Sequence, residues 1–300
     1  MSPSVKIGAL LHGRFLHSRS PFVRKGAARI LRIPRMRRRM MSTPEDFRKA
    51  PPVLCNSFPK SGTHLLIQVL EALPVRNYGR FLASMTSSIR FRPRTTDSTI
   101  GFLDTVVPGE LLTGHLFHDV EIAECLAAKG VAHYFIMRDL RDVVVSEAHY
   151  LANGNPWHRL HRHFKRLGSL EDRILLSIRG MPDEDIDYPD VGKRFGRYAQ
   201  WLNAPGVVSV RYEELRRQNV EGTIVRIVTD YLQRTAAGPI AVAELSARAL
   251  DNIEPNRSHT YRSGVVGGWE RAFTTKTRDA MKAVAGDLLI QLGYASDSSW

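Results

Sequence analysis

The segment Phe58-Pro59-Lys60-Ser61-Gly62-Thr63-His64 is the most informative part of this chain of 300 residues. An apolar run over residues 53–58 leads into it, and apolar residues recur with helical spacing over residues 65–73. The pattern predicts a strand, a tight turn and a helix, whose free N–H groups and positive dipole end attract anions. A lysine, two hydroxyls and a glycine in the turn suit a phosphate. The turn is therefore predicted to bind a phosphate-bearing ligand; the alternative is an ordinary turn with a solvated lysine.

The turn differs from the loop that binds nucleoside triphosphates in kinases and ATPases. That loop has the pattern G-x-x-x-x-G-K-[ST], in which the lysine follows the glycine. Here Lys60 precedes Gly62, and Pro59 stiffens the entry to the turn. The sequence therefore argues against a nucleotide kinase or an NTPase.

Short apolar segments alternate with amphipathic segments along the rest of the chain. The segments expected to form strands are 53–58, 111–114, 131–137 and 207–211. The segments expected to form helices are 62–73, 120–129, 142–151, 193–202, 221–233, 240–251 and 275–291. This alternation predicts an α/β fold with a central parallel sheet covered on both sides. Residues 76–110 and 152–192 are expected to be long excursions that form lids and acceptor pockets.

The net charge of +13 is concentrated at the N-terminus. The first 40 residues hold eleven basic side chains and no acidic one, which leaves +2 for residues 41–300. We expect residues 1–45 to be a poorly ordered basic extension and residues 46–300 to be a single domain that does not bind nucleic acid. The extension has three interpretations: an arm that touches anionic surfaces, an organelle transit peptide, or a segment before a true start at Met40 or Met41.

The two cysteines, Cys55 and Cys125, are too few for a disulfide framework and lie in apolar segments. They are predicted to be reduced core residues, which indicates a reducing compartment and a cytoplasmic location. No apolar run approaches the ~18 residues of a membrane-spanning helix.

A second charged turn, Met137-Arg138-Asp139-Leu140-Arg141-Asp142, leads into a helix that carries Ser146. Ligands gather at the carboxyl ends of parallel strands, so Arg138 is expected to face the same crevice as Lys60. An arginine fork and a serine hydroxyl suit a phosphate monoester. The carboxylates of Asp139 and Asp142 are expected to cap the helix and to pair with Arg141.

Two further clusters lie toward the C-terminus. The first, Val210-Arg211-Tyr212-Glu213-Glu214-Leu215, places an aromatic ring just beyond a strand. The second is a glycine-rich segment that holds an arginine, Tyr261-Arg262-Ser263-Gly264-Val265-Val266-Gly267-Gly268-Trp269. Its backbone N–H groups and guanidinium are suited to close over a phosphate.

Together the four clusters resemble the PAPS-dependent sulfotransferase family. PAPS is the sulfuryl donor 3′-phosphoadenosine 5′-phosphosulfate. Members of the family carry P-K-[SA]-G-T, R-D-x-x-D-V-x-x-S, Y-E-x-L and R-K-G-x-x-G-x-W in this order, and the resemblance covers roughly residues 52–275. It implies a P-loop NTPase-like three-layer sandwich with a central parallel sheet. It also implies transfer of a sulfuryl group from PAPS to a hydroxyl or amine of a small-molecule acceptor, with release of PAP.

The resemblance implies a role for each matching residue. The residues that would bind the 5′-phosphosulfate are Lys60, Ser61, Gly62, Thr63 and His64. The residues that would surround the 3′-phosphate are Arg138, Ser146, Arg262, Ser263 and Gly264. Tyr212 would contact the adenosine.

His115 is the expected catalytic base, with Lys60 as the cation beside the leaving group. In soluble members of the family a strand-end K-T-H motif supplies a catalytic histidine, and Thr113-Gly114-His115 occupies that place. An imidazole is suited to removing a proton from an alcohol or phenol near neutral pH. The alternatives are a structural role for His115 and a catalytic role for His118 or His149.

The sequence departs from the family pattern at several positions. Thr113 replaces the lysine of K-T-H, and Ser263 replaces a lysine of the last motif. Leu65 and Ala247 stand where family members carry aromatic residues near the adenine. Glu270 stands where the family's dimer segment has a lysine, so that dimer surface is not predicted, and the oligomeric state is left open.

No metal is expected, because the histidine-rich segment 157–163 lacks a carboxylate or cysteine at ligand spacing. It is expected to be a solvated helical face or lid. Two alternative functions remain beside the leading one: a carbohydrate or protein sulfotransferase, and a non-catalytic protein that binds PAP, another nucleotide or nucleic acid.

Overall fold

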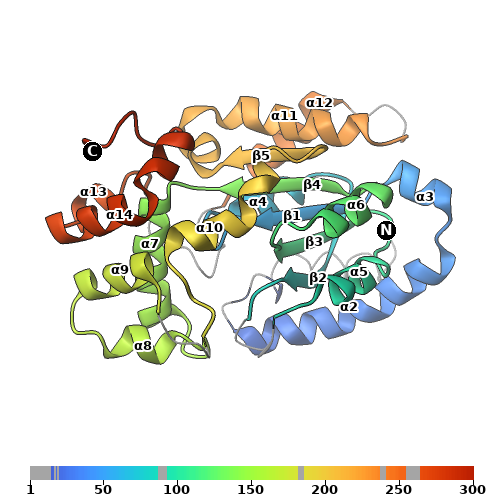
Figure 1. Ribbon diagram of the computed structural model, residues 1–300. Coiled ribbons are helices and arrows are strands. Elements are labelled where there is room, and N and C mark those ends of the chain that lie inside the picture. The colour runs from blue at the N-terminus through green and yellow to red at the C-terminus, as the bar shows by residue number, and fades with distance from the viewer. Residues whose placement is uncertain are drawn as a thin grey trace.

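The computed structural model describes residues 15–16, 18, 20–86, 93–181, 186–236, 241–254 and 264–300. Its centre is a five-stranded sheet in the order β2-β3-β1-β4-β5 (Figure 1). The strands are β1 (Val53–Ser57), β2 (Arg76–Ala83), β3 (Glu110–His115), β4 (Ala132–Met137) and β5 (Val207–Arg211). Every pairing between neighbouring strands is parallel, so the predicted parallel α/β sheet is confirmed.

Successive residues of the central strands pack into two different cores. In β1, Val53 and Cys55 join one core while Leu54 joins the other. In β4, Tyr134 and Ile136 share the first core with Val53, and Phe135 lies in the second. This alternation follows from the two-residue period of a strand and requires apolar side chains at every position. It explains why these strands carry continuous apolar runs.

Helices cover both faces of the sheet, which gives the predicted three-layer sandwich (Figure 1). The helices that pack in the core of Val53 are α4 (Thr63–Leu70), α11 (Val220–Gln233) and α12 (Val242–Asp251). Those in the core of Leu54 are α5 (Thr96–Leu103), α6 (Val120–Ala128), α7 (Leu140–His149), α8 (His161–Arg166), α9 (Leu170–Arg179), α10 (Val191–Ala199), α13 (Trp269–Ala272) and α14 (Thr275–Gln291). Short π and 3₁₀ segments complete the layers: η2 (Tyr150–Gly154), η3 (Gln200–Leu202) and η4 (Glu214–Gln218).

The two segments expected to be long excursions contain helices and a strand that were not predicted. Residues 76–110 include β2 and α5, and residues 152–192 include α8 and α9. The sequence concealed β2 because it is an edge strand with a shift of register between Asn77 and Phe81 and a left-handed Gly79 (φ 71°). An edge strand needs no continuous apolar run, so its pattern differs from that of the interior strands.

The basic extension is also more regular than expected. Residues 21–41 form helix α2 (Pro21–Met41), capped by Ser20, and α3 (Pro44–Lys49) follows. Helix α2 lies along the β2 edge of the sheet (Figure 1). Ala27 and Leu31 pack there against Tyr78 of β2 in a small core of their own. The expectation of a poorly ordered extension is therefore wrong for residues 21–41, because these apolar contacts hold the helix against the sheet.

An ion pair inside the protein adds to the attachment of α2. The Arg35 Nε donates to Glu110 Oε1 at 2.9 Å, and Arg80 Nη1 contacts the other carboxylate oxygen at 3.2 Å. The Glu110 carboxylate is fully buried, so it requires such partners. The charge of α2 is thus partly neutralised at the sheet, a pairing that the sequence pattern did not indicate.

The strand order places three turns at one edge of the sheet. The central strand β1 has β3 on one side and β4 on the other. The connection after β1 runs along the sheet to β2, and the connection after β3 runs the opposite way, past β1 to β4. Ligands of open α/β sheets bind at such a switch point, beyond the carboxyl ends of the strands. Lys60 follows β1, Arg138 follows β4, and His115 ends β3. The fold therefore gathers the predicted site residues at one edge.

Candidate functional site

The turn between β1 and α4 has an unusual backbone. Lys60 is the one residue other than glycine with a positive φ in the described part of the chain, at 66°, and Gly62, the N-cap of α4, has a φ of 98°. A Cβ atom added at Gly62 would lie 2.4 Å from Cδ2 of Tyr212. Glycine is therefore required both for the left-handed conformation and for the close approach of the tyrosine ring.

Three polar side chains of this turn have different surroundings. The Ser61 hydroxyl is fully buried and has no hydrogen-bond partner among the described residues. The Thr63 hydroxyl lies 2.7 Å from the Ser57 hydroxyl. The Lys60 ammonium lies 3.9 Å from the centre of the Tyr150 ring, a cation–π contact. A buried hydroxyl without a hydrogen-bond partner lowers the stability of the ligand-free protein. Such a group suits a site that binds a polar ligand.

His115 lies beside this turn at the end of β3. Its Nδ1 is 3.0 Å from both the backbone oxygen and the hydroxyl oxygen of Ser57. A proton on Nδ1 that is donated to the Ser57 carbonyl leaves Nε2 as the acceptor. Burial lowers the pKa of His115 to about 4, the nearby charge of Lys60 also lowers it, and the hydrogen bond to Ser57 opposes them. The imidazole is therefore neutral at pH 7 and able to accept a proton.

The rival histidines lie elsewhere. His118 packs its ring against Trp201, with centroids 4.6 Å apart, and its backbone N–H donates to Arg197. His149 is half-buried near the end of α7. Neither lines the cavity that His115 lines.

Arg138 occupies the turn after β4 and is almost fully buried. Its Nη2 donates to Asp142 Oδ2 at 3.0 Å and to the Val265 carbonyl at 2.6 Å. Its guanidinium stacks on the Tyr212 ring at 4.4 Å, and the Tyr212 hydroxyl donates to the Gly264 carbonyl. The Nε of Arg138 is buried and has no hydrogen-bond partner in the described part of the chain, so the guanidinium keeps a donor for a ligand.

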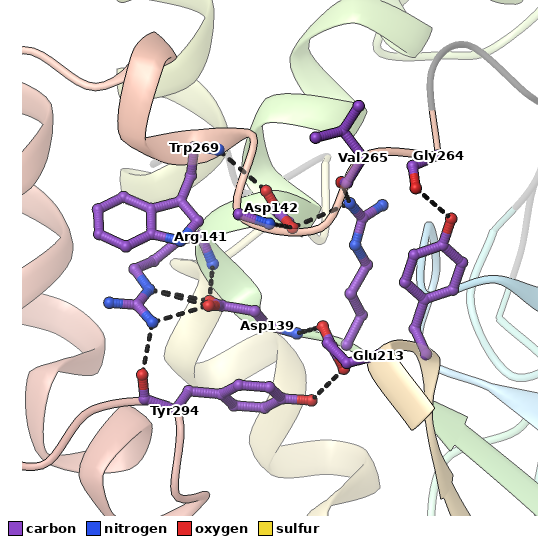
Figure 2. A network of polar contacts seen from close by, with 11 residues as sticks. Asp139, Arg141, Asp142, Glu213, Gly264, Val265, Trp269 and Tyr294 are labelled. Carbon is purple, nitrogen blue, oxygen red and sulfur yellow. Dashed lines mark hydrogen bonds and ion pairs between the residues drawn. The ribbon is translucent and has the colours of Figure 1, made fainter. Parts of the chain in front are cut away.

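The carboxylates of the same turn hold the protein together. Asp139 caps α7 and binds Arg141 through both oxygens, as expected (Figure 2). The expectation that Asp142 pairs with Arg141 is wrong. Asp142 pairs with Arg138 instead, and it accepts N–H bonds from Gly267 and Trp269 at 2.9 and 3.0 Å. The two N–H bonds tie the C-terminal segment to α7, and they could not be predicted from helix spacing.

Glu213, for which the sequence predicted no role, links the turn after β4 to the C-terminal segment that holds Tyr294. Its Oε1 accepts the backbone N–H of Asp139 and its Oε2 accepts the Tyr294 hydroxyl (Figure 2). Burial raises the pKa of Glu213, while these hydrogen bonds lower it. Its position two residues beyond β5 could have indicated such a role, since residues that follow parallel strands lie at the edge of the sheet where ligands bind.

One cavity of about 610 Å³ joins these groups. Predicted site residues that line it include Lys60, Gly62, Thr63, His64, His115, Arg138, Ser146, Tyr212 and Gly264. Ser61 is buried beneath the turn rather than in the lining. Arg262 and Ser263 lie outside the described residues. The structure thus brings nine of the predicted residues to a single cavity of ordinary ligand-binding size.

The lining of the cavity also contains aromatic and apolar side chains: Phe81, Met85, Phe117, Tyr150, Leu151, Tyr188 and Tyr198. Three residues of α2 also line the cavity: Arg24, Lys25 and Ala28. No sequence pattern indicated that these α2 residues would line the cavity, because their place depends on how α2 packs against the sheet.

The described residues contain no group of three or more His, Cys, Asp or Glu side chains arranged to hold a metal ion. Within those same residues no helix is both long enough and apolar enough to cross a bilayer.

Comparison with solved structures shows the fold. The mouse sulfotransferase SULT7A1 complexed with PAP aligns with a TM-score of 0.54 and 19% identity, over 82% of this chain and 86% of that chain. Retinol dehydratase with androsterone and the inactive cofactor PAP aligns with 0.56 and 15%, over 87% and 85%. Retinol dehydratase with retinol and PAP aligns with 0.54 and 14%, over 87% and 86%. The predicted sulfotransferase-type α/β fold is therefore confirmed.

No protein-family model matches the chain, and no curated protein sequence matches it.

Proposed function

We propose that the protein transfers a sulfuryl group from PAPS to a hydroxyl of a small-molecule acceptor. One observation carries the proposal. A single cavity brings together the Lys60 turn, the Arg138 turn and the neutral imidazole of His115, and two buried donors beside it, Ser61 Oγ and Arg138 Nε, have no protein partner in the described chain. Two anion sites that flank a base fit a donor with two phosphate groups.

The residues of the two turns would hold the two ends of the donor. At the 5′ end, Lys60, Ser61, Gly62, Thr63 and His64 would contact the phosphosulfate through side chains and the first N–H groups of α4. At the 3′ end the phosphate would meet Arg138, Ser146, Arg262, Ser263 and Gly264. Tyr212, fixed between Gly62 and Arg138, would contact the adenosine. This set is chemically suited to phosphates, and the PAP in the three similar structures supports the choice of nucleotide.

His115 is proposed to act as the base. As the acceptor oxygen forms a bond to sulfur, its proton passes to Nε2 of His115, and the bond from sulfur to the phosphate oxygen of the donor breaks. The Ser57 carbonyl, 3.0 Å from Nδ1, stabilises the imidazolium that forms. Negative charge develops on the departing phosphate, where Lys60 and the N–H groups of α4 stabilise it.

The aromatic side chains of the cavity support an acceptor with a mainly hydrocarbon surface. The Phe81 ring lies 5.3 Å from the His115 ring and other aromatic side chains line the same cavity, so an alcohol or phenol on an apolar skeleton fits better than a sugar chain or a peptide. Retinol and androsterone in the similar structures are acceptor-sized molecules of this kind. A cytoplasmic location belongs to the same proposal, since Cys55 and Cys125 are free thiols.

Calorimetry with PAP tests the donor site. We expect PAP to bind at least about tenfold more tightly than AMP, because the additional phosphate meets Arg138. A screen of alcohols, phenols, steroids and amines with labelled PAPS then tests transfer. Equal affinities for PAP and AMP would contradict the assignment of PAPS as the sulfuryl donor. Tight PAP binding with no transfer to any class would favour the non-catalytic alternative.

A further inference from the structure

The outward face of α2 is unlike the rest of the surface. Apolar side chains stand exposed along it: Phe22 (71%), Ile30 (56%), Ile33 (74%), Met36 (50%) and Met40 (86%). On a helix of 3.6 residues per turn, Phe22, Ile33 and Met40 lie within roughly 20° of one another. They lie opposite Leu31, which packs in the core beside Tyr78. Helix α2 therefore has two apolar faces, of which the sheet covers one.

Basic side chains flank the exposed apolar face. Helix α2 carries eight lysine and arginine residues and no acidic residue. Six of the eight are exposed: Lys25, Arg29, Arg32, Arg37, Arg38 and Arg39. The other two are Arg35, which is bound to Glu110, and Arg24, which lines the main cavity. A face of this composition is complementary to an anionic surface that also accepts apolar side chains.

A hollow joins the charged and the apolar parts of this face. It is lined by Arg32, Arg35, Met36, Arg39, Met40 and Thr105. Three guanidiniums beside two thioether side chains suit a phosphate that continues into a hydrocarbon chain. The headgroup of an anionic phospholipid has this combination.

We propose that α2 docks on an anionic lipid bilayer, with Phe22, Ile33 and Met40 entering the interface and the flanking arginines binding lipid phosphates. The helix lies at the edge of the molecule, beyond β2, where a flat surface can reach it (Figure 1). A second copy of this chain is a poorer occupant, since pairing two α2 helices would bring like charges together. Nucleic acid would use the arginines but would leave the apolar side chains in water.

The same helix reaches the proposed acceptor cavity. Arg24, Lys25 and Ala28 line that cavity, and Phe22 lies within two helical turns of all three. On the assumption that the proposed transfer function is correct, docking would place the cavity beside the bilayer, so that an apolar alcohol could enter from the membrane. The docking itself is independent of the transfer reaction.

Sedimentation of the full-length protein with sucrose-loaded vesicles tests the proposal. One set of vesicles is phosphatidylcholine alone, and the other contains about a third phosphatidylglycerol. We expect strong partition to the anionic vesicles. The double variant Arg32→Gln/Arg39→Gln should bind them about 30-fold more weakly, from ~1 kcal/mol for each basic residue near a charged surface. Ile33→Ser/Met40→Ser should bind about tenfold or more weakly, because the apolar insertion is lost.

A matched variant removes two exposed apolar residues far along the chain from α2. Val225→Ser/Leu250→Ser changes residues of α11 and α12 that are 43% and 36% exposed, and it should bind vesicles like the wild type. Circular dichroism melting checks that each variant is folded. This readout needs no PAPS, so its failure is distinct from failure of the proposed function.

Three outcomes would overturn the proposal. The first is wild-type protein that does not partition to anionic vesicles. The second is an Ile33→Ser/Met40→Ser variant that binds as tightly as the wild type while the arginine variant does not, which would indicate a simple polyanion site such as one for nucleic acid. The third is a dimer in lipid-free gel filtration that Ile33→Ser/Met40→Ser dissociates, which would identify a second copy as the occupant.

Discussion

Two turns at the same edge of the sheet use the same local architecture in opposite ways. Each follows a buried parallel strand and begins a helix, one between β1 and α4 and the other between β4 and α7. In the first turn Lys60 and Gly62 adopt left-handed conformations, and the buried Ser61 hydroxyl has no partner in the described chain. In the second turn Asp139 and Asp142 are each bound to an arginine and to backbone N–H groups.

This difference distinguishes groups that can bind a ligand from groups that stabilise the protein around it. Groups that remain unsatisfied cost stability in the free protein and become useful when a ligand arrives. Groups that are satisfied by the protein fix the geometry into which the ligand fits. The first turn is therefore expected to matter for activity and little for stability, and the second for both.

Replacing the lysine of the first turn is expected to have the largest effect. Lys60→Met keeps the length of the side chain and removes the charge that would face the departing phosphate. We expect kcat to fall by about 10³-fold, in the range for a lost cation at a transition state. The melting temperature should stay within about 2 °C of the wild type. Sulfuryl transfer from labelled PAPS and calorimetric melting measure the two quantities.

Lys193→Met supplies the control for this change. The Lys193 side chain is 77% exposed and its ammonium lies 3.2 Å from Asp190, so its loss should change neither rate nor stability. A Lys60→Met protein with wild-type kcat would remove Lys60 from the chemistry and would make the two turns alike.

The second turn should respond to Asp142→Ala mainly through stability. The substitution leaves the buried Arg138 guanidinium without its carboxylate and frees the N–H groups of Gly267 and Trp269. We expect a loss of about 3 kcal/mol or more in the free energy of unfolding, measured in urea. Removing an exposed pair by Glu45→Ala, where both partners are more than half exposed, should cost less than about 1 kcal/mol. Similar losses for the two variants would contradict a supporting role for Asp142.

The contrast also explains what the sequence could predict. Strands β1, β3, β4 and β5, the two turns and helices α4, α6, α7, α10, α11, α12 and α14 were predictable, because each leaves a local pattern: an apolar run, a helical period, or a polar cluster at a strand end. Helices α5, α8, α9 and α13 were not predicted. The five strand-end groups at Lys60, His115, Arg138, Tyr212 and Glu213 lie at one edge, as parallel topology requires.

Pairings between distant segments could not be predicted in the same way. Arg35 with Glu110, Asp142 with Trp269, and Ser57 with His115 join residues whose separation carries no period. The regular structure of α2 was missed for the same reason. Its basic composition resembles that of a disordered arm, whereas contacts with Tyr78 and Val107 and the ion pair of Arg35 with Glu110 hold it against the sheet.

His115 provides a third test, because it lies against the first turn. Its pKa of about 4 in the free protein predicts a kcat/KM that is constant from pH 7.5 to 5.5 and falls tenfold per pH unit only below about 4. A histidine with an ordinary pKa would halve the rate near pH 6.5. His115→Asn should lower kcat about 10²-fold, whereas His118→Asn, outside the cavity, should not. A wild-type profile that turns at pH 6.5 would contradict the burial of the imidazole.

The same shift makes folding depend on pH. The folded pKa values of His115 and His133, about 4 and about 3, lie below the unfolded value near 6.5. Below pH 6.5 the unfolded chain therefore binds protons that the native protein does not, and stability falls as the pH is lowered through this window. Urea unfolding at pH 7.5, 6 and 5 should show this decline, and rates below pH 5 must be measured on protein that is shown to be folded.

Ser61→Ala is expected to have the smallest effect and to separate the two turns most directly. Its hydroxyl contributes no hydrogen bond within the described protein, so its removal should leave the free protein equally stable or more stable by up to about 1 kcal/mol. The affinity for PAP should fall about three- to tenfold, because the variant would lose the proposed bond between the 5′-phosphate and this hydroxyl, which is buried in the free protein. Ser246→Ala is the matched control, because Ser246 of α12 also has a buried hydroxyl without a partner in the described chain and does not line the cavity. Ser246→Ala should raise stability similarly and leave PAP binding unchanged. If Ser61→Ala alone lost stability, the first turn would be held by bonds within the protein, as the second turn is.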